Sequence, residues 1–238
     1  MKKTAFHAKT KRARVCRKSH LKSAAGNNNL CNNAISVCRK SNLKSAEGSL
    51  LQAPVYEVFF SYQGEGIYAG LPQIFVRFAG CNIKCGYCDT PYSIKVSAKA
   101  KNCFSDELVK KIQKIYAKNK KRFQFAAPSG AFLKPSVAIT GGEPLIRSKF
   151  LKQFLPKLKR SGFCVYLETN GTLPKNLKEV VKYCDTIAAD FKFPSECKKN
   201  FWRQHKEFLQ IAGKKVFVKC VLTNKTSYLE ILKTADII

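Results

Sequence analysis

A short cysteine-rich loop constrains this chain more than any other feature of its sequence. Cys81, Cys85 and Cys88 follow a C-x3-C-x2-C spacing directly after the largely apolar run at 74–78 (IFVRF). Cysteine thiolates are the ligands of iron-sulfur clusters, and full ligation by protein takes four of them. The loop offers three thiolates within eight residues. It therefore predicts a cluster in which one iron stays open to a small molecule.

Structural zinc is the alternative interpretation of the same loop, because C-x2-4-C spacing also suits tetrahedral zinc. Such a site needs a fourth ligand, and the next cysteine downstream is Cys103, in a lysine-rich stretch. Spacing alone leaves both metal centres open. The polar turns described below, all after residue 130, favour the cluster.

Composition sets limits on location and partners. The chain has 238 residues, and it contains no apolar stretch of the roughly 18 residues that a membrane helix needs. Its basic amino terminus lacks the apolar segment of a signal peptide, so we expect a cytoplasmic protein with no membrane partner. The net charge of +29 favours polyanions, but no recognition motif accompanies it, so we expect no specific nucleic-acid binding.

The first 52 residues differ in character from the rest. The sequence at 15–24 (VCRKSHLKSA) returns at 37–46 (VCRKSNLKSA), a repeat with a period of 22 residues. Two copies are too few to bury a core of their own, and low hydrophobicity with high charge predicts disorder. We therefore predict a disordered, low-complexity basic extension over 1–52 and a folded domain over 53–238.

From residue 53 onward, apolar and β-branched runs alternate with amphipathic basic stretches, which is typical of strand-helix units around a parallel sheet. The predicted fold class is thus α/β. Strands are predicted at 73–78, 137–140, 164–168, 186–190 and 215–222. Helices are predicted at 106–118 with Ser105 as cap, 149–160 ending at Gly162, 174–183 with Pro174 in its first turn, 196–211 ending at Gly213, and 227–233.

Polar signatures follow four successive predicted strands. The cysteine loop follows the first, the turn at 141–144 (GGEP) the second, the turn at 168–171 (ETNG) the third and the sequence at 190–192 (DFK) the fourth. A Gly-Gly or Asn-Gly pair alone indicates only a turn. In barrel-like α/β folds, however, the carboxyl ends of the strands share one face. We therefore expect these loops to meet at one pocket.

These motifs resemble those of radical S-adenosylmethionine (SAM) enzymes, and within that superfamily the chain is similar to the 7-carboxy-7-deazaguanine synthases of the queuosine pathway. The cysteine triplet and the 141–144 turn are typical of the whole superfamily. The narrower resemblance rests on the segment at 60–66 (FSYQGEG), on Arg77 and on the Asp89-Thr90 pair. It implies a partial (βα) barrel of the radical SAM type. The family pattern continues beyond Ile238 into a sixth strand, so we expect a barrel truncated at its carboxyl end.

The resemblance implies the cofactors and their ligands. Cys81, Cys85 and Cys88 would hold a 4Fe-4S cluster whose open iron binds SAM, and Tyr87 would contact the adenine. Cleavage of SAM would yield a 5'-deoxyadenosyl radical, and no catalytic residue is expected beyond the cluster and SAM. The methionine amino group would lie at Gly141, Gly142 and Glu143, and the ribose and carboxylate at Glu168, Asn170, Asp190, Lys192 and Ser195.

The resemblance also implies the reaction, a lyase step that contracts the ring of 6-carboxy-5,6,7,8-tetrahydropterin to 7-carboxy-7-deazaguanine with loss of ammonia. Gln63, Gly64 and Glu65 would read the pterin edge. Arg77 would pair with the substrate carboxylate as a bidentate fork, because an arginine inside an otherwise apolar strand needs a partner. Thr90 would offer a hard oxygen ligand to Mg²⁺. A flavodoxin- or ferredoxin-type electron donor and a homodimer are expected as partners.

Three alternatives stay open at this point. A glycyl-radical or anaerobic ribonucleotide reductase activating enzyme shares the cysteine triplet, although it would not require the 63–65 segment beside Arg77. A basic zinc protein that binds RNA would use the cysteines as structural ligands. The repeat within 1–52 and the end at Ile238 would also suit an inactive truncated product.

Overall fold

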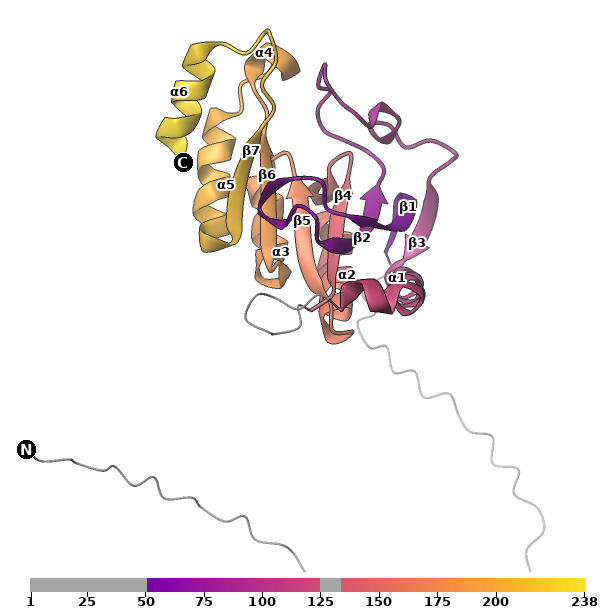
Figure 1. The fold of residues 1–238 in the computed structure, drawn as a ribbon. Coiled ribbons are helices and arrows are strands. Elements are labelled where there is room, and N and C mark those ends of the chain that lie inside the picture. The colour runs from indigo at the N-terminus through magenta and orange to yellow at the C-terminus, as the bar shows by residue number, and fades with distance from the viewer. Residues whose placement is uncertain (1–50, 125–133) are drawn as a thin grey trace, which may run out of the picture. The chain divides into compact units, whose positions relative to one another are not determined.

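The computed structural model describes residues 51–124 and 134–238, so the extension predicted at 1–52 lies outside the described residues except for its last two positions. Seven strands form one mixed sheet in the order β3-β1-β2-β4-β5-β6-β7 (Figure 1). From β2 to β7 the neighbours in this order are parallel, whereas β1 is antiparallel to both β2 and β3. The strands are β1 Gln52–Tyr62, β2 Pro72–Phe78, β3 Lys101–Phe104, β4 Ser136–Gly141, β5 Cys164–Thr169, β6 Thr186–Phe191 and β7 Val216–Cys220.

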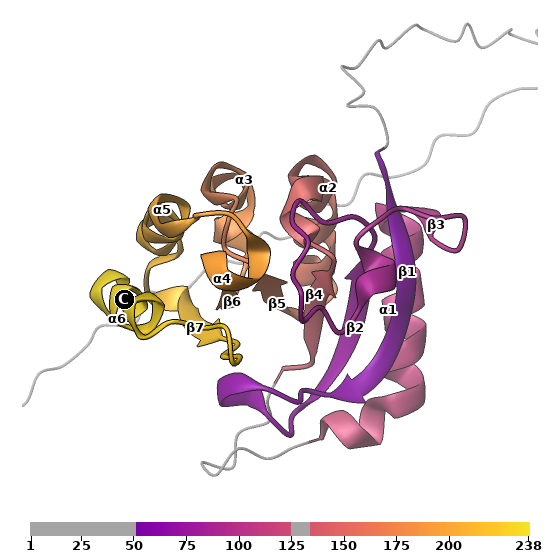
Figure 2. The ribbon, with the colours of Figure 1, turned by 90° about the horizontal axis from the view of Figure 1, so that it is seen from above.

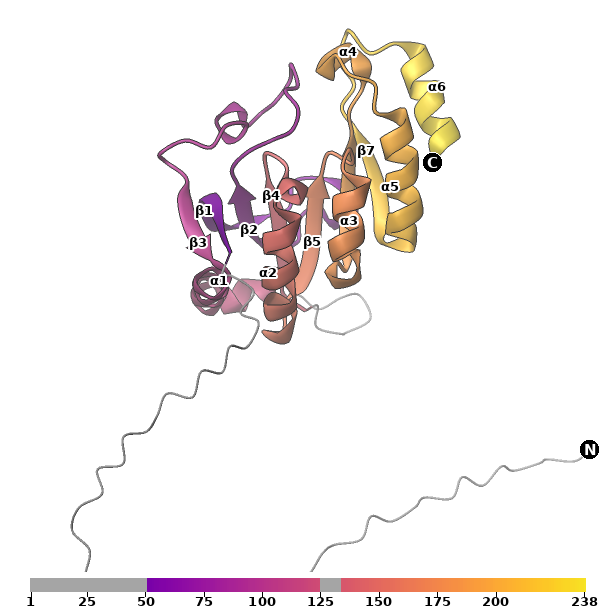
Figure 3. The same ribbon diagram turned by 180° about the vertical axis from the view of Figure 1, so that it is seen from behind.

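Helices cover one face of this sheet, as Figures 2 and 3 show for α1, α2, α3 and α5. Within the described ranges, no helix combines the length and the apolar character needed to cross a membrane. The α-helices are α1 Ser105–Asn119, α2 Ser148–Arg160, α3 Pro174–Val180, α4 Pro194–Cys197, α5 Trp202–Ala212 and α6 Tyr228–Ile237. The short 3-10 helices are η1 Gly66–Tyr68, η2 Pro91–Ser93, η3 Lys120–Phe123, η4 Pro144–Arg147, η5 Val181–Tyr183 and η6 Gly213–Lys215.

The five predicted strands are confirmed as β2, β4, β5, β6 and β7, and the partial α/β barrel is confirmed with them. The sequence reasoning missed β1 and β3. The middle of β1 is half-buried on both faces, and β3 has only four residues, all exposed or half-exposed. Neither strand therefore has the alternating pattern from which a strand is recognised. Both depend on pairing with their neighbours.

Two helix predictions were wrong in detail. Ser105 does not cap α1 but begins it, and its hydroxyl accepts a hydrogen bond from Lys157. The carboxylate of Glu107 instead accepts the backbone N–H of Phe104 over 3.0 Å. The helix predicted at 196–211 is two helices, α4 and α5, because Lys198 adopts a left-handed conformation with φ of +55°.

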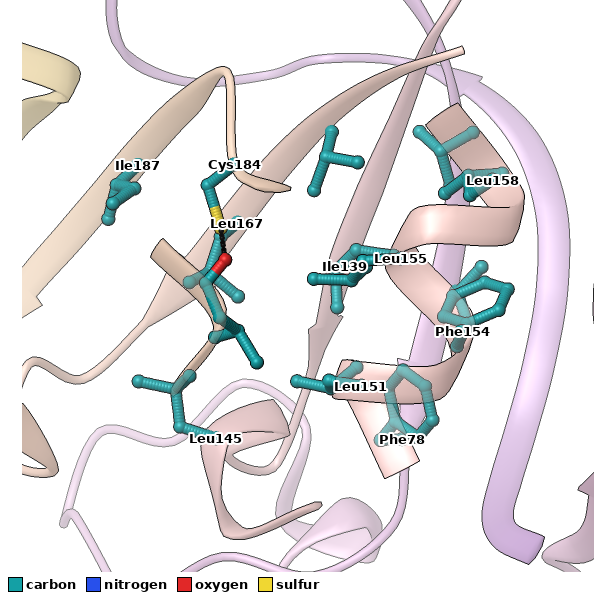
Figure 4. Packing of buried hydrophobic residues seen from close by; sticks show 14 of the residues in the cluster. Phe78, Ile139, Leu145, Leu151, Phe154, Leu155, Leu158, Leu167, Cys184 and Ile187 are labelled. Carbon is teal, nitrogen blue, oxygen red and sulfur yellow. Dashed lines mark hydrogen bonds between the residues drawn. The ribbon is translucent and has the colours of Figure 1, made fainter. Parts of the chain in front are cut away.

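The main core lies between the sheet and the helices (Figure 4). Apolar side chains recur along α2 at the three- and four-residue spacing of one helix face, which directs them together toward the sheet. These side chains meet buried residues from β2, β4 and β5, so burial holds the helix against the strands. The residues concerned are Leu151, Phe154, Leu155 and Leu158 in α2, with Phe78, Ile139 and Leu167 in the strands.

The other face of the sheet carries an apolar layer and then a polar one. Phe75, Ala138, Tyr166 and Ala188, from β2, β4, β5 and β6, are buried and pack together. Side chains alternate along a strand, so the residue two positions further on faces the same way. Those next residues lie toward the carboxyl ends of the strands and are Arg77, Thr140, Glu168 and Asp190.

The connection between β1 and β2 crosses this second face and reaches β7, as Figure 2 shows. Tyr68 in η1 packs edge-on against Tyr166, with ring centroids 5.6 Å apart. Gly66 has φ of +68°, and a Cβ atom there would lie 2.5 Å from the ring of Phe217 in β7. Only glycine therefore fits this close approach. The connection brings the 63–66 segment beside the polar layer.

Candidate active site

A cleft of about 320 Å³ opens at the carboxyl edge of the parallel strands. Its walls come from β2, β4, β5, β6 and β7 and from the cysteine loop, as the strand-end pattern predicted. The predicted site residues that line it are Glu65, Arg77, Cys81, Cys85, Tyr87, Cys88, Thr90, Gly141, Gly142, Glu168, Asn170, Asp190 and Lys192. The predicted residues Gln63, Gly64, Glu143 and Ser195 lie outside this lining.

Backbone hydrogen bonds fasten the start of the cysteine loop to two other segments. Gly80 N–H donates to Ser93 O over 2.8 Å, and Cys81 N–H donates to Ile94 O over 3.0 Å. Glu143 N–H donates to Gly80 O over 2.8 Å, which joins the loop to the glycine turn after β4. The first cysteine is therefore held by main-chain contacts that do not depend on a metal.

The three thiols of the loop are half-exposed and line the cleft together. Burial raises the pKa of the Cys85 thiol to about 11, which Lys192 opposes and the thiols of Cys81 and Cys88 reinforce. Among the described residues, no three His, Cys, Asp or Glu side chains are grouped closely enough to hold one metal ion. Three thiols around one cleft fit a multi-iron cluster, in which each thiolate binds an iron of its own.

The glycine turn after β4 packs directly on the end of β2. Gly141 has φ of +136°, and a Cβ atom there would overlap the backbone of Phe78. A Cβ atom on Gly142 would overlap the carbonyl of Gly80 and lie 2.7 Å from the carbonyl of Ser93. The two glycines thus let the turn and the cysteine loop share one wall of the cleft.

Glu143 faces the protein interior and is fully buried. Its carboxylate accepts hydrogen bonds from Leu145 N–H, Thr169 Oγ1 and Asn170 N–H, at 2.7 to 2.9 Å. Burial raises the pKa of this carboxyl to about 7, although the three hydrogen bonds act against the rise. The carboxylate therefore ties the turn after β4 to the turn after β5, and its predicted contact with a methionine amino group stays a prediction.

Asn170 connects the turn after β5 to the cysteine loop. Its Nδ2 donates to Asn82 Oδ1 over 3.0 Å and approaches Cys81 Sγ at 3.9 Å, while its Oδ1 accepts from Thr172. Asn82 in turn donates to Thr172 Oγ1 over 2.8 Å. Neither Asn82 nor Thr172 was predicted as a site residue, although Asn82 lies within the cysteine loop and Thr172 directly follows the 168–171 turn.

Asp190, Lys192 and Tyr87 form a chain of polar contacts across the cleft. Lys192 Nζ lies 2.8 Å from Asp190 Oδ2 and 3.2 Å from the Tyr87 hydroxyl, and 4.9 Å from the centroid of the Tyr87 ring. Burial acts to lower the pKa of Lys192, but Asp190 and Tyr87 outweigh it and raise the pKa. The second carboxylate oxygen of Asp190 is buried without a hydrogen-bond partner among the described residues. Asp190 thus fixes Lys192 at the cleft wall and keeps one buried carboxylate oxygen without a partner in the described part of the chain.

Arg77 has a partner that the sequence reasoning did not foresee. Its Nε lies 2.6 Å from Oε1 of Glu57 in β1, and Tyr92 donates to the same oxygen over 3.0 Å. The Arg77 side chain is 17% exposed and also lies over the Phe59 ring. Its two terminal nitrogens make no hydrogen bond or ion pair with another described residue, and the side chain lines the cleft.

Glu65 forms an ion pair with Lys219 in β7, and both side chains line the cleft. Lys219 was not predicted, although it lies two positions after Phe217 and so shares its face of the strand. Gly64 is exposed beside this pair, with nothing within 4 Å of a Cβ atom placed on it. Ser195 lies in α4, outside the lining of the cleft, and its N–H donates to Glu230 over 2.9 Å.

Thr90 lines the cleft beside Asp89, and its hydroxyl lies 3.4 Å from Asp89 Oδ1. Ser93 Oγ lies 3.4 Å from the same hydroxyl and donates to Thr90 O over 2.8 Å. The hydroxyl is thus held at the cleft wall with a carboxylate next to it. Both are hard oxygen donors.

Comparisons with known proteins agree with this geometry. The sequence model of the radical SAM superfamily matches residues 75–228. The chain is 38% identical over 196 residues to the 7-carboxy-7-deazaguanine synthase of Geobacter sulfurreducens, covering 78% of this chain and 76% of that one. It is 34% identical to the synthase of Methanopyrus kandleri, covering 73% and 71%, and 35% identical to that of Archaeoglobus fulgidus, covering 78% of each.

Proposed function

The chain belongs to the radical SAM superfamily and, within it, to the 7-carboxy-7-deazaguanine synthase family, and we propose that it forms 7-carboxy-7-deazaguanine by the ring contraction of a carboxylated tetrahydropterin. It is a radical SAM lyase of the queuosine pathway. One observation carries the proposal. Three thiols and the ends of five parallel strands surround a single cleft whose wall also holds an arginine with open terminal nitrogens.

Cys81, Cys85 and Cys88 would hold the 4Fe-4S cluster. When bound, the cluster supplies the electron that splits SAM. Tyr87 offers a ring held by Lys192 to the adenine, and Asp190, which lines the cleft beside them, would hold a ribose hydroxyl. Asn170, Glu168, Gly141 and Gly142 complete the SAM side of the cleft, with Glu143 fixing the turns behind it. Ser195 would contribute to SAM binding only from the edge of the cleft, since it does not line the cleft.

Arg77 would bind the substrate carboxylate. Glu57 holds its Nε, and this orients the two terminal nitrogens toward the cleft as a fork that matches a carboxylate. Glu65 and the backbone at Gly64 would read the pterin edge from the mouth of the cleft. Gln63 is buried and already bonded to Glu168, so its contribution would be to fix Glu168 in place.

Mg²⁺ would bind beside the substrate carboxylate. The Thr90 hydroxyl and the adjacent Asp89 carboxylate supply hard oxygen ligands at the cleft wall. Two protein ligands suffice for Mg²⁺, because water and substrate oxygens complete its coordination shell. The reaction needs an external one-electron reductant, for which we propose a flavodoxin- or ferredoxin-type protein. A homodimer and a cytoplasmic location stay predictions.

Product formation by the full chain tests the proposal. The protein is reconstituted anaerobically with iron and sulfide, reduced with dithionite, and given SAM and 6-carboxy-5,6,7,8-tetrahydropterin. Mass spectrometry should detect 7-carboxy-7-deazaguanine. Cys85→Ala should abolish SAM cleavage, whereas Cys103→Ala, which removes a cysteine of β3 that does not line the cleft, should leave it intact. Arg77→Ala should keep uncoupled SAM cleavage and lose substrate affinity.

Two outcomes would contradict the proposal. Zinc at one ion per chain, with no iron bound, would favour the basic RNA-binding module instead. Iron-loaded protein that cleaves SAM but leaves the pterin unchanged, and that modifies a partner protein, would favour an activating enzyme.

A further inference from the structure

Lys219 extends the polar layer of the sheet by one strand. In the parallel ladder between β6 and β7 it is the register partner of Asp190. Phe217, two positions earlier, packs against the ring of Tyr166 in the apolar layer, with ring centroids 6.3 Å apart. Because side chains alternate along a strand, Lys219 faces the same side of the sheet as Phe217. Its side chain is 20% exposed and lines the cleft.

The ion pair of Lys219 with Glu65 joins β7 to the connection between β1 and β2. Two contacts already hold the backbone of this connection. The N–H of Glu65 donates to Gln63 Oε1 over 3.2 Å, and Gly66 lies against the ring of Phe217. The Glu65 side chain is 67% exposed, and within the described ranges Lys219 is the one group bonded to its carboxylate. Lys219 thus decides where this carboxylate lies.

The other cations of the cleft wall already have acidic partners. Lys192 lies 2.8 Å from Asp190, and Arg77 lies 2.6 Å from Glu57. Neither pair includes Glu65. Loss of the Lys219 charge would therefore leave the Glu65 carboxylate without a cation, and no other lysine or arginine that lines the cleft is free to replace it.

The chemistry of a pterin explains why the position of this carboxylate matters. The pyrimidinone edge of a pterin carries two neighbouring N–H donors, on the 2-amino group and on N3. A carboxylate offers two acceptor oxygens at a matching separation, as it does to the fork of an arginine. An exposed glutamate that must first be ordered costs binding free energy, whereas one that is already held does not. A cation at its side supplies that order before the ligand arrives.

We propose that Lys219 is a positioning residue for the substrate, which holds the Glu65 carboxylate over the cleft so that both of its oxygens accept from the two N–H groups of the pterin edge. The inference rests on the proposed function, because it takes the pterin as the substrate. A bound pterin shields the Lys219–Glu65 pair from water, and an ion pair with less water around it is stronger. Lys219 therefore acts through Glu65 and does not itself touch the pterin.

A double-mutant cycle tests this indirect role. The full chain, reconstituted with iron and sulfide and loaded with SAM, is prepared as Lys219→Met, as Glu65→Gln and with both substitutions. Methionine keeps an unbranched side chain without the charge. Lys219→Arg restores the charge. Lys225→Met is the matched control, because Lys225 is exposed after β7 and has no ion pair with another described residue.

The measured quantity is the Kd of 6-carboxy-5,6,7,8-tetrahydropterin by anaerobic calorimetry without reductant, so that no turnover occurs. We expect Lys219→Met to weaken binding about fivefold, the amount that a partly exposed ion pair contributes. Glu65→Gln should weaken it about twentyfold, since it removes charge-assisted hydrogen bonds. The double variant should match Glu65→Gln alone, because Lys219 has no role once the carboxylate is gone. Lys219→Arg and Lys225→Met should stay within about twofold of the unsubstituted chain.

Three results would overturn the positioning role. These are an unchanged Kd in Lys219→Met, a loss of about a hundredfold in the double variant, which is the product of two independent effects, and an equal loss in Lys225→Met. The Kd for SAM and the thermal midpoint of Lys219→Met should stay at the level of the unsubstituted chain. If that variant does not fold, Lys219→Gln replaces it in the cycle. A pterin that fails to bind even the unsubstituted, SAM-loaded chain would instead refute the proposed function, so the two failures are distinguishable.

Discussion

The side-chain amide of Gln63 donates a 2.8 Å hydrogen bond to the carboxylate of Glu168, 105 positions further along the chain. The same amide nitrogen also donates to Gln73 over 3.1 Å, and Gln63 Oε1 accepts the N–H of Glu65 over 3.2 Å. One buried glutamine thus links the segment proposed to read the substrate to a residue proposed to bind SAM. The two halves of the cleft are mechanically joined by it.

Replacing Gln63 by glutamate should weaken SAM binding about tenfold. The new carboxylate would face the Glu168 carboxylate at hydrogen-bond distance, and the amide N–H that Glu168 accepts would be lost. For a buried polar pair such a change costs on the order of 1–3 kcal/mol. Equilibrium titration with SAM checks this. Gln113→Glu, the same change on an exposed residue of α1, should leave SAM affinity unchanged, and an equal loss in both variants would contradict the linkage.

Glu57→Gln should raise KM for the pterin about fivefold while kcat changes little. Glu57 holds Nε of Arg77, and an ion pair that is partly exposed contributes on the order of 1 kcal/mol. Steady-state kinetics separates the two constants. Tyr92→Phe removes only the hydroxyl that bonds to the same carboxylate, so its effect on KM should be smaller. An unchanged KM in Glu57→Gln would speak against Glu57 as the group that positions Arg77.

Gly142→Ala should destabilise the fold by about 1–3 kcal/mol and reduce the iron content after reconstitution. Its Cβ atom would overlap the carbonyl of Gly80 and push the cysteine loop away from the turn. Thermal unfolding and iron analysis measure both effects. Gly64→Ala, where nothing lies within 4 Å of the added atom, should retain stability and iron. Iron loading of Gly142→Ala at the unsubstituted level would be inconsistent with the shared wall.

His205 should make stability fall as the solution is acidified. Its ring stacks on Phe191 at 4.0 Å, and both ring nitrogens are buried. Burial lowers the pKa of His205 from 6.5 to about 4; the backbone of Asn170 acts against this shift, and Lys192 adds to it. A depressed histidine pKa contributes stability above 6.5 that is lost progressively between pH 6.5 and 4, up to about 3 kcal/mol.

Urea unfolding of His205→Phe and of the unsubstituted chain at pH 7.5 and pH 5 measures this loss. Phenylalanine keeps the stacking and cannot be protonated, so the difference in stability between the two proteins should shift in favour of the variant at pH 5. Glu143, with its raised pKa, acts in the opposite direction but is common to both proteins and cancels in the difference. A difference that does not depend on pH would falsify the assignment.

Much of the site could be predicted because its signals are local. The cysteine spacing, the Gly141-Gly142 turn and the polar residues after each strand can be recognised within a few positions. Strand ends in a parallel sheet share an edge, so local signals were enough to predict one common cleft. The pairs Arg77–Glu57, Glu65–Lys219 and Gln63–Glu168 were missed, since each joins segments whose proximity depends on sheet order.

The sequence by itself thus determined which residue types surround the cleft. These are three thiols, two glycines that allow close packing, and a set of charged side chains near the ends of the strands. The tertiary structure decided which of them face the cleft and which brace it from behind. Glu143 and Gln63 carry the same functional groups as the lining residues, yet the packing buries them and uses their hydrogen-bonding capacity. Burial and long-range pairing follow from strand register, which no short stretch of sequence specifies by itself.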